Sequence, residues 1–464
     1  MAEPNIVFVL VDDMGYGDFG AFNYGASRTP ALDGLMREGV CLSQHYSASP
    51  ICAPARASLQ TGRYPHRTGC IDTVETHRLD RMSVRETTTA DLLKRAGYAT
   101  GLIGKWHNGA VEPRYHPNAR GYDEFAGFRG GGWDYYDWTL DYNGTFRQAD
   151  GRYLTDVFTD EAVDFIARHR RQPFFLTVAY NAPHEPFQAP EEDVAPFLET
   201  GSFNRGVSTL YGMVRRMDRG VGRILEALAR HGLAANTVVL FTSDNGPQFG
   251  RPSDGEMDTT RFNCGFRGQK GDVWEGGIRV PMIVRWPAGL DGGRHVDGMV
   301  HFVDWLPTLL AMADLAPPAE LALDGESVLE VLRGRPEKAD RRRFWQWNRY
   351  VPIGVCNAAM RDGPWKLVRP AISPLCTRNP EFSRIDREIT RHPEKYLGRE
   401  LPTAPLPVCQ VPSPPPPARL YNLDADPLET RDLADVHPGR AGRMQRELES
   451  WFEQVEADRA SIDD

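Results

Sequence analysis

The feature that most constrains the fold is a regular alternation, through the first two thirds of the chain, of short apolar runs with longer amphipathic stretches. Residues Asn5–Val11 (NIVFVLV) are apolar almost without interruption, which is typical of a strand buried on both faces. Similar runs occur at 99–103, 174–179, 237–242 and 281–286. This alternation predicts an α/β domain, in which a large, mixed but mostly parallel sheet is sandwiched by helices.

The amphipathic stretches between these runs predict the helices. One helix begins at Pro30 and ends before Gly39, because proline is favoured in the first turn of a helix and glycine just past its end. A longer helix is predicted at 208–231, where apolar residues recur on one face. Shorter helices are predicted at 89–96 and 156–169.

The composition changes around residues 333–343, where the sequence RGRPEKADRRR is polar and basic. We therefore expect a larger α/β domain at 1–335 and a smaller α+β domain at 336–464. A chain of 464 residues is long for one domain, so a division into two is the ordinary expectation.

The smaller domain is predicted to contain an antiparallel sheet, with strands at 343–347 and 365–369, and a helix at 439–457. Between them lies a proline-rich segment, 370–418, in which the sequence indicates no obvious element. So long a connection is usually an insertion or a functional loop.

Composition excludes some partners and bears on the compartment. The net charge of −9 and pI of about 5.8 do not favour nucleic acid as a partner. No apolar run approaches the ~18 residues that a membrane-spanning helix requires, so no membrane is expected as a partner. The first residues, MAEPN, leave no room for a secretory signal before the first strand. The sequence as it stands predicts a cytoplasmic protein, or a periplasmic or secreted one if a signal has been removed.

The seven cysteines are scattered, odd in number and without the spacing of metal ligands. This arrangement predicts neither a disulfide framework nor a zinc site.

Chemically useful side chains follow four of the predicted strands. Because ligands of open α/β sheets bind beyond the carboxyl ends of the strands, we expect these side chains to meet at one edge. They are Asp12 and Asp13 after the first strand, Lys105 and His107 after 99–103, His184 after 174–179, and Asp244 and Asn245 after 237–242.

The oxygen donors among them suggest a metal. Asp12, Asp13, Asp244 and Asn245 are hard ligands, which suit calcium or magnesium better than zinc. Taken singly, the Asp-Asp pair also suits a turn or a helix cap, and Asp-Asn-Gly is a frequent turn sequence. Both pairs at neighbouring strand ends favour the metal site.

The segment 49–63, SPICAPARASLQTGR, resembles the signature of the type I sulfatases, an arylsulfatase-like family. In that family a maturation enzyme recognises Cys-x-Pro-x-Arg and converts the cysteine to formylglycine, an aldehyde. The resemblance implies that Cys52 is converted and that a formylglycine-generating enzyme is a partner of this chain. The alternative is a free, buried cysteine at a helix start.

Further segments resemble the same family and extend over most of the chain. The resemblance implies the fold of the alkaline phosphatase superfamily, a large mixed α/β sheet between helices with a smaller antiparallel sheet and helix. The matching segments are 5–20, 29–33, 104–107, 181–184, 243–246, 267–281, 360–368 and 420–427.

The resemblance also implies roles for individual residues. One calcium ion would be bound by the matured residue 52 together with Asp12, Asp13, Asp244 and Asn245. Arg56 would hold the aldehyde hydrate, and His107 would act as the base on residue 52. The sulfate would be contacted by Lys105, His184 and Lys270. A serine that supports the first lysine in the family has no clear match here. The insertion at 370–418 is longer than the family pattern requires and is a candidate cover for part of the substrate site.

The chemistry of a sulfate monoester is consistent with these roles. One hydroxyl of the hydrated aldehyde at residue 52 would attack sulfur, while His184 protonates the leaving alcohol. His107 would then deprotonate the second hydroxyl, and sulfate would be expelled as the aldehyde re-forms. Histidine suits both roles because its pKa lies near neutrality. The alternatives are that His107 packs beside Trp106 and that His184 is an ordinary loop residue.

The sequence leaves alternatives open for both the substrate and the functional class. The aromatic residues in 121–146 either stack on a sugar or aryl ring or belong to the core; they are Trp133, Tyr135, Tyr136, Trp138 and Tyr142. The favoured function is hydrolysis of a small-molecule or saccharide sulfate ester, aryl or carbohydrate, by a calcium-dependent sulfuric ester hydrolase. The competing functions are a phosphonate or phosphate ester hydrolase of the same superfamily and a non-catalytic protein that binds sulfated glycans.

Overall fold

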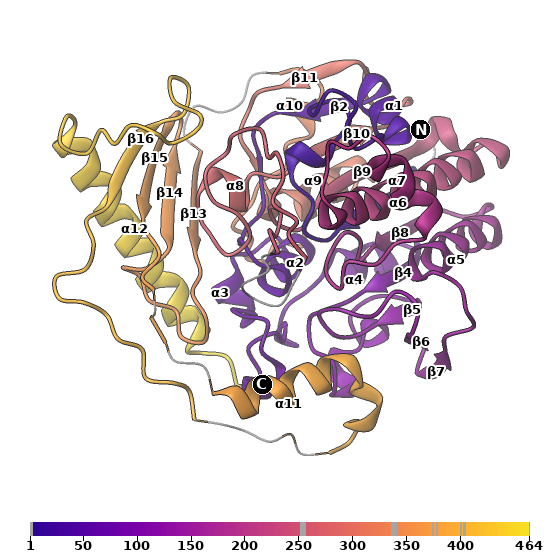
Figure 1. Cartoon of the computed structure of the whole chain (residues 1–464), viewed down its shortest axis with the longest axis horizontal. Helices are drawn as coiled ribbons and strands as arrows, with labels where there is room; N and C mark the ends of the chain where they lie inside the picture. The colour runs from indigo at the N-terminus through magenta and orange to yellow at the C-terminus, as the bar shows by residue number, and fades with distance from the viewer. Residues whose placement is uncertain are drawn as a thin grey trace.

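The computed structural model contains a large sheet between helices and a small sheet with one long helix (Figure 1). It describes residues 3–250, 257–335, 341–373, 375–376, 379–399, 401 and 405–463.

Ten strands of the described chain form the large sheet, in the order β11-β2-β10-β9-β1-β8-β4-β5-β6-β7. The strands are β1 (Asn5–Val11), β2 (Val40–Leu42), β4 (Ala99–Lys105), β5 (Glu124–Phe128), β6 (Thr139–Tyr142), β7 (Thr145–Gln148), β8 (Phe174–Ala179), β9 (Thr237–Ser243), β10 (Met282–Arg285) and β11 (Arg294–Val296). The central strands β9, β1, β8, β4 and β5 are parallel, while β10, β6 and β7 pair antiparallel with their neighbours. The predicted mixed but mostly parallel sheet is therefore confirmed.

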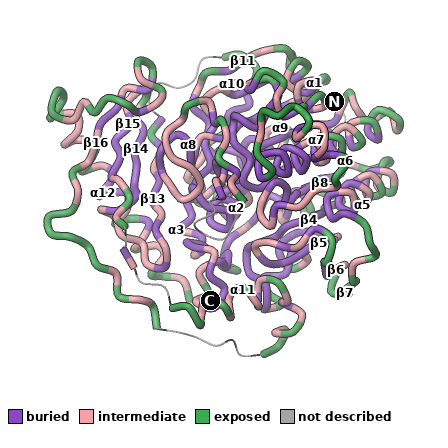
Figure 2. Tube along the Cα trace, in the orientation of Figure 1, coloured by how far each residue is buried: buried purple, intermediate pink, exposed green. Residues whose placement is uncertain are grey.

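Alternate residues of β1 point into two separate cores. Phe8 and Leu10 pack into a cluster on one face, and Val7 and Val9 pack into a cluster on the other. Because each face carries its own apolar cluster, the whole strand is buried, as its continuous apolar sequence predicts. The neighbouring strands β8 and β4 are buried in the same way (Figure 2).

Helices supply the other half of each cluster. On the face of Phe8 lie α2 (Cys52–Thr61), α4 (Thr89–Arg95), α9 (Trp305–Met312) and α10 (Leu329–Leu332). On the face of Val7 lie α1 (Pro30–Glu38), α5 (Leu154–His169), α6 (Glu191–Leu198) and α7 (Arg205–Arg230). The short helices α3 (Pro65–Thr68) and α8 (Glu275–Ile278) and the strand pair β3 (His45–Tyr46) and β12 (Val300–His301) lie in the connections. None of the described helices is long and apolar enough to cross a bilayer.

Most predicted helices and strands lie within three residues of their expected bounds. The largest shift is at α7, which begins at Arg205 because the side chain of Asn204 caps it by accepting a hydrogen bond from Val207 N. Strand β4 continues two residues past its predicted end and so includes Lys105.

The small sheet is antiparallel, in the order β13 (Arg342–Gln346), β14 (Ala358–Asp362), β15 (Trp365–Arg369) and β16 (Arg419–Asn422). Helix α12 (Pro438–Arg459) covers one face, where Trp451 stacks on Phe344 at a centroid distance of 5.2 Å. The predicted boundary region includes residues 336–340, which lie outside the described chain. Because the small sheet begins just after them, we propose residues 335 and 336 as the junction of two domains.

The insertion at 370–418 contains a helix that the sequence reading missed. Helix α11 (Pro380–Arg391) carries apolar residues at Phe382, Ile385 and Ile389, a helical spacing that the surrounding prolines obscure. A disulfide joins Cys376 to Cys409, so the expectation of no disulfide framework is wrong for this pair. The other five cysteines are free.

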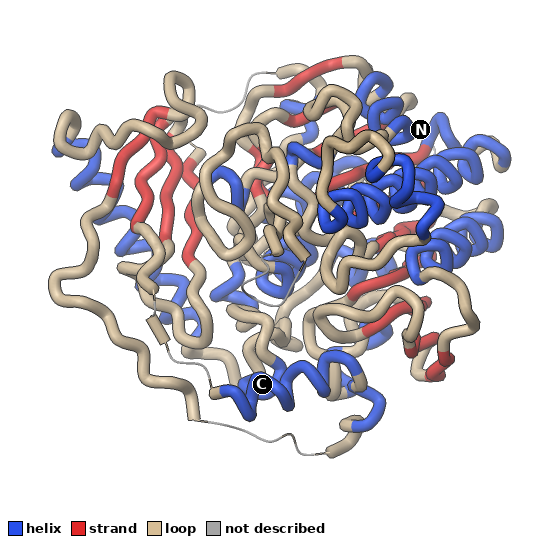
Figure 3. The backbone as a smooth tube through the Cα atoms, viewed as in Figure 1, coloured by secondary structure: helices blue, strands red, loops and turns tan. Residues whose placement is uncertain are grey.

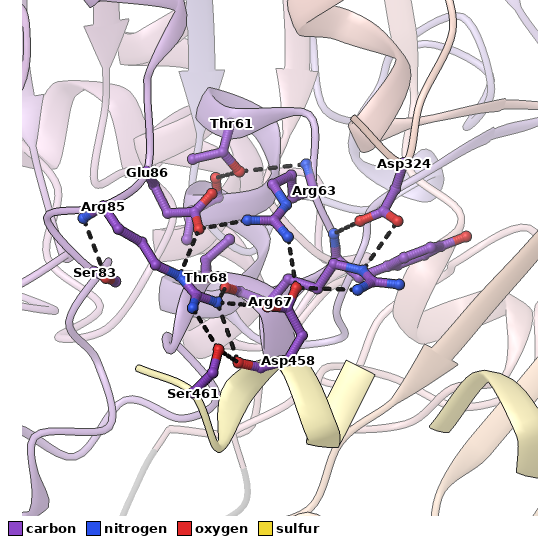
Figure 4. A network of polar contacts seen from close by, with 12 residues as sticks. Thr61, Arg63, Arg67, Thr68, Ser83, Arg85, Glu86, Asp324, Asp458 and Ser461 are labelled. Carbon is purple, nitrogen blue, oxygen red and sulfur yellow. Dashed lines mark hydrogen bonds and ion pairs between the residues drawn. The ribbon is translucent and has the colours of Figure 1, made fainter. Parts of the chain in front are cut away.

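A network of ion pairs docks the end of α12 on the α2–α3 region (Figure 4). Asp458 lies 2.6 Å from Arg63 Nη2, 3.0 Å from Arg67 Nη1 and 3.0 Å from Arg85 Nη2. Burial alone would raise the pKa of Asp458, but the hydrogen bond from Arg67 and the charges of Arg63 and Arg85 lower it below the usual 3.8.

We expect Asp458→Asn to lower the free energy of unfolding by about 1–3 kcal/mol at pH 7, because three arginines lose a charged partner. A carboxyl with a lowered pKa stabilises the fold above its unfolded pKa, and this contribution is lost as the pH falls through the folded pKa. The difference between the two proteins should therefore shrink below about pH 4. Denaturant unfolding across pH measures it, with Glu453→Gln on the exposed side of α12 as the control. An equal effect of both substitutions would contradict this account.

Candidate active site

The carboxyl ends of β9, β1, β8 and β4 lie side by side, and the predicted polar residues leave the sheet there. Figure 3 shows several loops between the large sheet and the small sheet. The structure brings together all ten residues that the sequence singled out: Asp12, Asp13, Cys52, Arg56, Lys105, His107, His184, Asp244, Asn245 and Lys270.

Asp12 is fully buried and is neutralised by cations from two elements. Lys105 Nζ lies 2.5 Å from Asp12 Oδ2, and Arg56 Nη2 lies 3.9 Å from the same oxygen. Burial would raise the pKa of Asp12, but the charges of Lys105 and His184 outweigh it and lower the pKa. Asp12 is therefore an anion in the folded protein.

Asp13 sits in the left-handed region, with φ of 64°, and binds three neighbours. Lys270 Nζ lies 2.7 Å from Oδ2, Asn245 Nδ2 donates to Oδ1 at 2.7 Å, and His184 Nε2 lies 3.7 Å from Oδ2. Lys270 comes from a loop and not from a strand end. Its contact with Asp13 overcomes burial and raises the lysine pKa, so it stays charged.

Cys52 is the first residue of α2, and Arg56 follows one turn later on the same side. Arg56 Nε donates to Asp244 Oδ2 at 2.9 Å and Nη1 donates to the carbonyl of Lys105 at 3.2 Å. Cys52 itself is 3% exposed. Burial raises the pKa of its thiol even though Lys105 and Lys270 act to lower it. Arg56 thus links the helix to two strand ends, with the thiol held neutral between them.

His107 is buried under a glycine. A Cβ atom on Gly131 would lie 2.6 Å from His107 Cε1 and Nε2, so no other residue fits over the ring without displacing it. Burial, with the charges of Lys105 and Arg56, holds the pKa of His107 well below its usual value. Its Nδ1 atom has no hydrogen-bond partner among the described residues. The ring is accordingly neutral and able to accept a proton.

His184 is held by backbone contacts in the loop after β8. Its Nδ1 atom is 2.7 Å from the carbonyl oxygen of Glu185, which leaves Nε2 facing Asp13. The hydroxyl of Tyr135 donates to the carbonyl oxygens of Asn181 and His184, both at 2.9 Å. The side chain of His184 is 13% exposed, so the cluster reaches solvent at this residue.

The oxygen atoms of the site fit a hard cation. Asp12 Oδ1 and Asn245 Oδ1 are buried and have no hydrogen-bond partner among the described residues. One ligand atom each of Asp12, Cys52 and Asp244 lies within 4.8 Å of the others, and the same holds for Asp12, Asp13 and His184. Acceptors left unpaired in a buried site are what a divalent cation would bind.

Several residues that support the site were not singled out by sequence reasoning. Ser243 Oγ accepts a hydrogen bond from Met14 N and donates to the carbonyl of Asn245, and Arg261 pairs with Asp18 beside the Asp13 segment. The serine is the one detectable in advance, since it precedes Asp244 in the strand-end motif. Among the described residues, Lys105 pairs with Asp12, and no serine hydrogen-bonds to its side chain.

Of the aromatic residues in 121–146, most belong to the core. Trp133, Tyr135 and Trp138 are at most 4% exposed, whereas Tyr136 is 42% exposed. The reading of this stretch as a stacking platform is therefore wrong for the three buried rings. The three rings lie in the connection between β5 and β6, and they pack into the apolar cluster that includes residues of α5.

Comparison with known proteins agrees with this fold. The family model described as "Sulfatase" matches residues 4–315, and that of the N-sulphoglucosamine sulphohydrolase C-terminal region matches residues 268–370. Human N-acetylgalactosamine-6-sulfatase is 35% identical over 72% of this chain, and the match spans 66% of the human protein's length.

Two solved structures place the fold. Ps i-CgsB in complex with k-i-k-neocarrahexaose has a TM-score of 0.78 and 31% identity, covering 97% of this chain and 92% of that one. Phosphonate monoester hydrolase of Agrobacterium radiobacter has a TM-score of 0.62 at 20% identity, covering 97% and 96%. The protein thus has an alkaline phosphatase-like α/β fold. Within that superfamily, the chain belongs to the sulfatase family.

We expect Tyr135→Phe to lower the free energy of unfolding by about 1–3 kcal/mol, because the carbonyl groups of Asn181 and His184 lose the hydroxyl that they share. The loss should be largest around the loop of His184, so amide hydrogen exchange at 181–186 should accelerate. Tyr136→Phe removes an exposed hydroxyl and serves as the control. Unchanged exchange in Tyr135→Phe would show that the hydroxyl does not hold this loop.

Proposed function

We propose that this protein hydrolyses sulfate monoesters, of aryl or carbohydrate alcohols, to the alcohol and inorganic sulfate. The observation that carries the proposal is the position of residue 52. It begins a helix, it lies within 4.8 Å of Asp12 and Asp244, and the cations Lys105 and Lys270 flank it. Membership of the sulfatase family supports the same reaction.

The cations of the site account for binding of the sulfate group. Lys105, Lys270 and Arg56 are preorganised by buried carboxylates, so they need no reorganisation when an anion arrives. The first turn of α2 adds backbone N–H groups and the positive end of the helix dipole. We place the sulfate between Lys105 and Lys270, with His184 at the open side.

Calcium would be held by Asp12, Asp13, Asp244, Asn245 and residue 52. When bound, calcium would supply positive charge against the sulfate oxygens, and residue 52, once converted to formylglycine, would supply a hydrated-aldehyde nucleophile. Conversion requires a formylglycine-generating enzyme as a partner of the chain.

The two histidines divide the proton transfers. The side chain of His184 is partly exposed and its Nε2 lies 3.7 Å from Asp13 Oδ2, so we assign it the donation of a proton to the ester oxygen of the leaving alcohol. His107 is buried and neutral, because its pKa is held well below the usual value, and its unpaired Nδ1 is the atom that we assign to accept a proton from residue 52. Their different exposure separates the acid from the base.

Two measurements test the proposal directly. Mass spectrometry of the peptide around residue 52 should reveal an aldehyde in place of the thiol. Rates on matched aryl sulfate, phosphate and phosphonate esters should favour the sulfate. A faster rate on the phosphonate or phosphate ester would assign the chain to those hydrolases, and an unmodified thiol with no turnover would indicate a sulfated-glycan binding protein.

We expect calcium removal by a chelator to lower both activity and melting temperature, because an ion that binds only the folded state stabilises it. The stabilisation is about 2.7 kcal/mol at an ion concentration one hundred times the dissociation constant. Asp13→Ala should reduce activity to a similar degree and make the melting temperature insensitive to added calcium. Full activity after exhaustive chelation would exclude a metal role.

We expect Cys52→Ser to give at most one equivalent of released alcohol. The serine hydroxyl keeps Arg56, Lys105, Lys270 and His184 around it, so attack on sulfur remains possible. The sulfated serine that results lacks a second hydroxyl for His107 to deprotonate, so covalent catalysis stops after one half-reaction.

Intact-mass measurement after incubation with an activated aryl sulfate detects this adduct, and Cys264→Ser serves as a control because it also replaces a free thiol by a hydroxyl. Sustained turnover by Cys52→Ser would mean that water releases the sulfate. Absence of both burst and adduct would mean that serine at this position is not a nucleophile.

A further inference from the structure

Part of the insertion forms a strap beside the active site, defined here as residues 379–399. It contains α11 and lies outside the residues that the two family models match, which end at 315 and 370. The disulfide Cys376–Cys409 closes the insertion at its base. The strap lies along the lower edge of the molecule in Figure 1.

The strap is fixed to the catalytic domain along its length. The side chain of Asp386 accepts hydrogen bonds from the backbone N and the hydroxyl of Thr76, at 3.0 and 3.2 Å. Ile389 is fully buried in a small cluster with Ala110 and Val111. These contacts place the last turn of α11 in a defined position.

That last turn presses on the glycine-rich loop over the two histidines. A Cβ atom on Gly130 would lie 2.4 Å from the carbonyl oxygen of Thr390, and the ring of His392 packs edge-on against Trp133 at 5.9 Å. The intervening Gly131 and Gly132 are the residues that touch the active site.

Gly131 covers the ring of His107, and a Cβ atom on Gly132 would lie 3.4 Å from His184 Cε1. Residues 390–392 of the strap are therefore separated from both histidines by one layer of backbone. The strap borders the open side of the site, where the alcohol portion of a substrate would project.

Arg391 brings a positive charge to this border. It is exposed and has no ion-pair partner among the described residues, whereas the neighbouring His392 lies 3.3 Å from Glu394. Burial would raise the pKa of Asp134, but hydrogen bonds and the charge of Arg391 lower it. Asp134 accepts a hydrogen bond from Gln188, in the loop that carries His184. Arg391 stands between Thr390, which contacts Gly130, and His392, which packs against Trp133, so its cationic side chain belongs to this border in a protein of net charge −9.

We propose that Arg391 binds a second anionic group on a saccharide sulfate, so that the strap selects substrates whose neighbouring sugar ring carries a sulfate or carboxylate. This specificity rests on the proposed hydrolysis of sulfate esters. An arginine binds either anion through paired N–H donors, which gives orientation as well as affinity.

Three matched disaccharides test the proposal by titration calorimetry, on protein carrying Cys52→Ala so that no ligand is turned over. Each contains N-acetylgalactosamine 6-sulfate, linked to galactose, to a sulfated galactose or to glucuronate. The two doubly anionic probes should bind about tenfold more tightly than the singly charged one. Arg391→Gln should abolish this preference. Equal affinities of the three probes for the protein that retains Arg391, or no binding of any, would overturn the proposal.

Arg384→Gln is the matched control, since Arg384 is an exposed arginine seven residues, and about 10 Å, before Arg391 on the same helix. It should keep the preference. A loss equal to that in Arg391→Gln would mean that only overall charge matters, and it would also overturn the proposal.

The role of the strap is tested by opening its base. Cys376→Ser with Cys409→Ser should weaken the preference for doubly anionic probes, while hydrolysis of an aryl sulfate by protein with residue 52 intact stays within about twofold. Full preference in the opened protein would show that the disulfide does not position Arg391. Absence of any sulfate ester hydrolysis would instead refute the proposed function. The binding results would still decide whether Arg391 binds a second anionic group.

Discussion

The structure depends on the mutual neutralisation of charges that are buried together. Asp12, Asp13 and Asp244 face Lys105, Lys270 and Arg56, and most of these side chains are almost inaccessible to solvent. Removing one partner of such a pair leaves a buried charge uncompensated, which is strongly destabilising. Because the six groups come from two strand ends, a third strand, a helix and a loop, their charges hold the elements of the site in register.

The small sheet takes part in this arrangement at a distance. Lys366 of β15 is fully buried and lies 2.9 Å from both Glu275 and Glu429. Asn357 also donates to the carbonyl oxygen of Gly271, the residue after Lys270, at 2.7 Å. These contacts hold the loop that carries Lys270 against the small sheet, so that sheet helps to position a cation of the site.

How much of this could be read from sequence depends on the range of the forces involved. The strand Asn5–Val11 was predictable because burial on both faces leaves a local apolar signature. The meeting of Asp12 with Lys105 was predictable because parallel strands share one edge. Helix α11 was missed because prolines flank a short pattern, and the disulfide because Cys376 and Cys409 are 33 residues apart without a framework spacing.

The contact of Gly131 with the ring of His107 shows a different limit of prediction from sequence. Nothing in a run of glycines says which side chain it covers, and only the fold reveals that Gly131 lies against the ring. The same holds for Tyr135, whose hydroxyl binds backbone atoms 46 and 49 residues away. A tyrosine or tryptophan can pack its ring in the core while its polar atom binds a loop. The presence of such residues in 121–146 therefore could not decide between core packing and a stacking platform for the substrate.

The donor atoms around residue 52 also bear on why a cysteine there would be modified. Asp12, Asp13, Asp244 and Asn245 offer oxygen, which suits a hard cation, whereas the thiol is a soft ligand in the same group of atoms. A hydroxyl-bearing side chain at position 52 would match the other donors. The mismatch between one sulfur and its oxygen neighbours therefore supports conversion of Cys52, independently of the sequence signature that surrounds it.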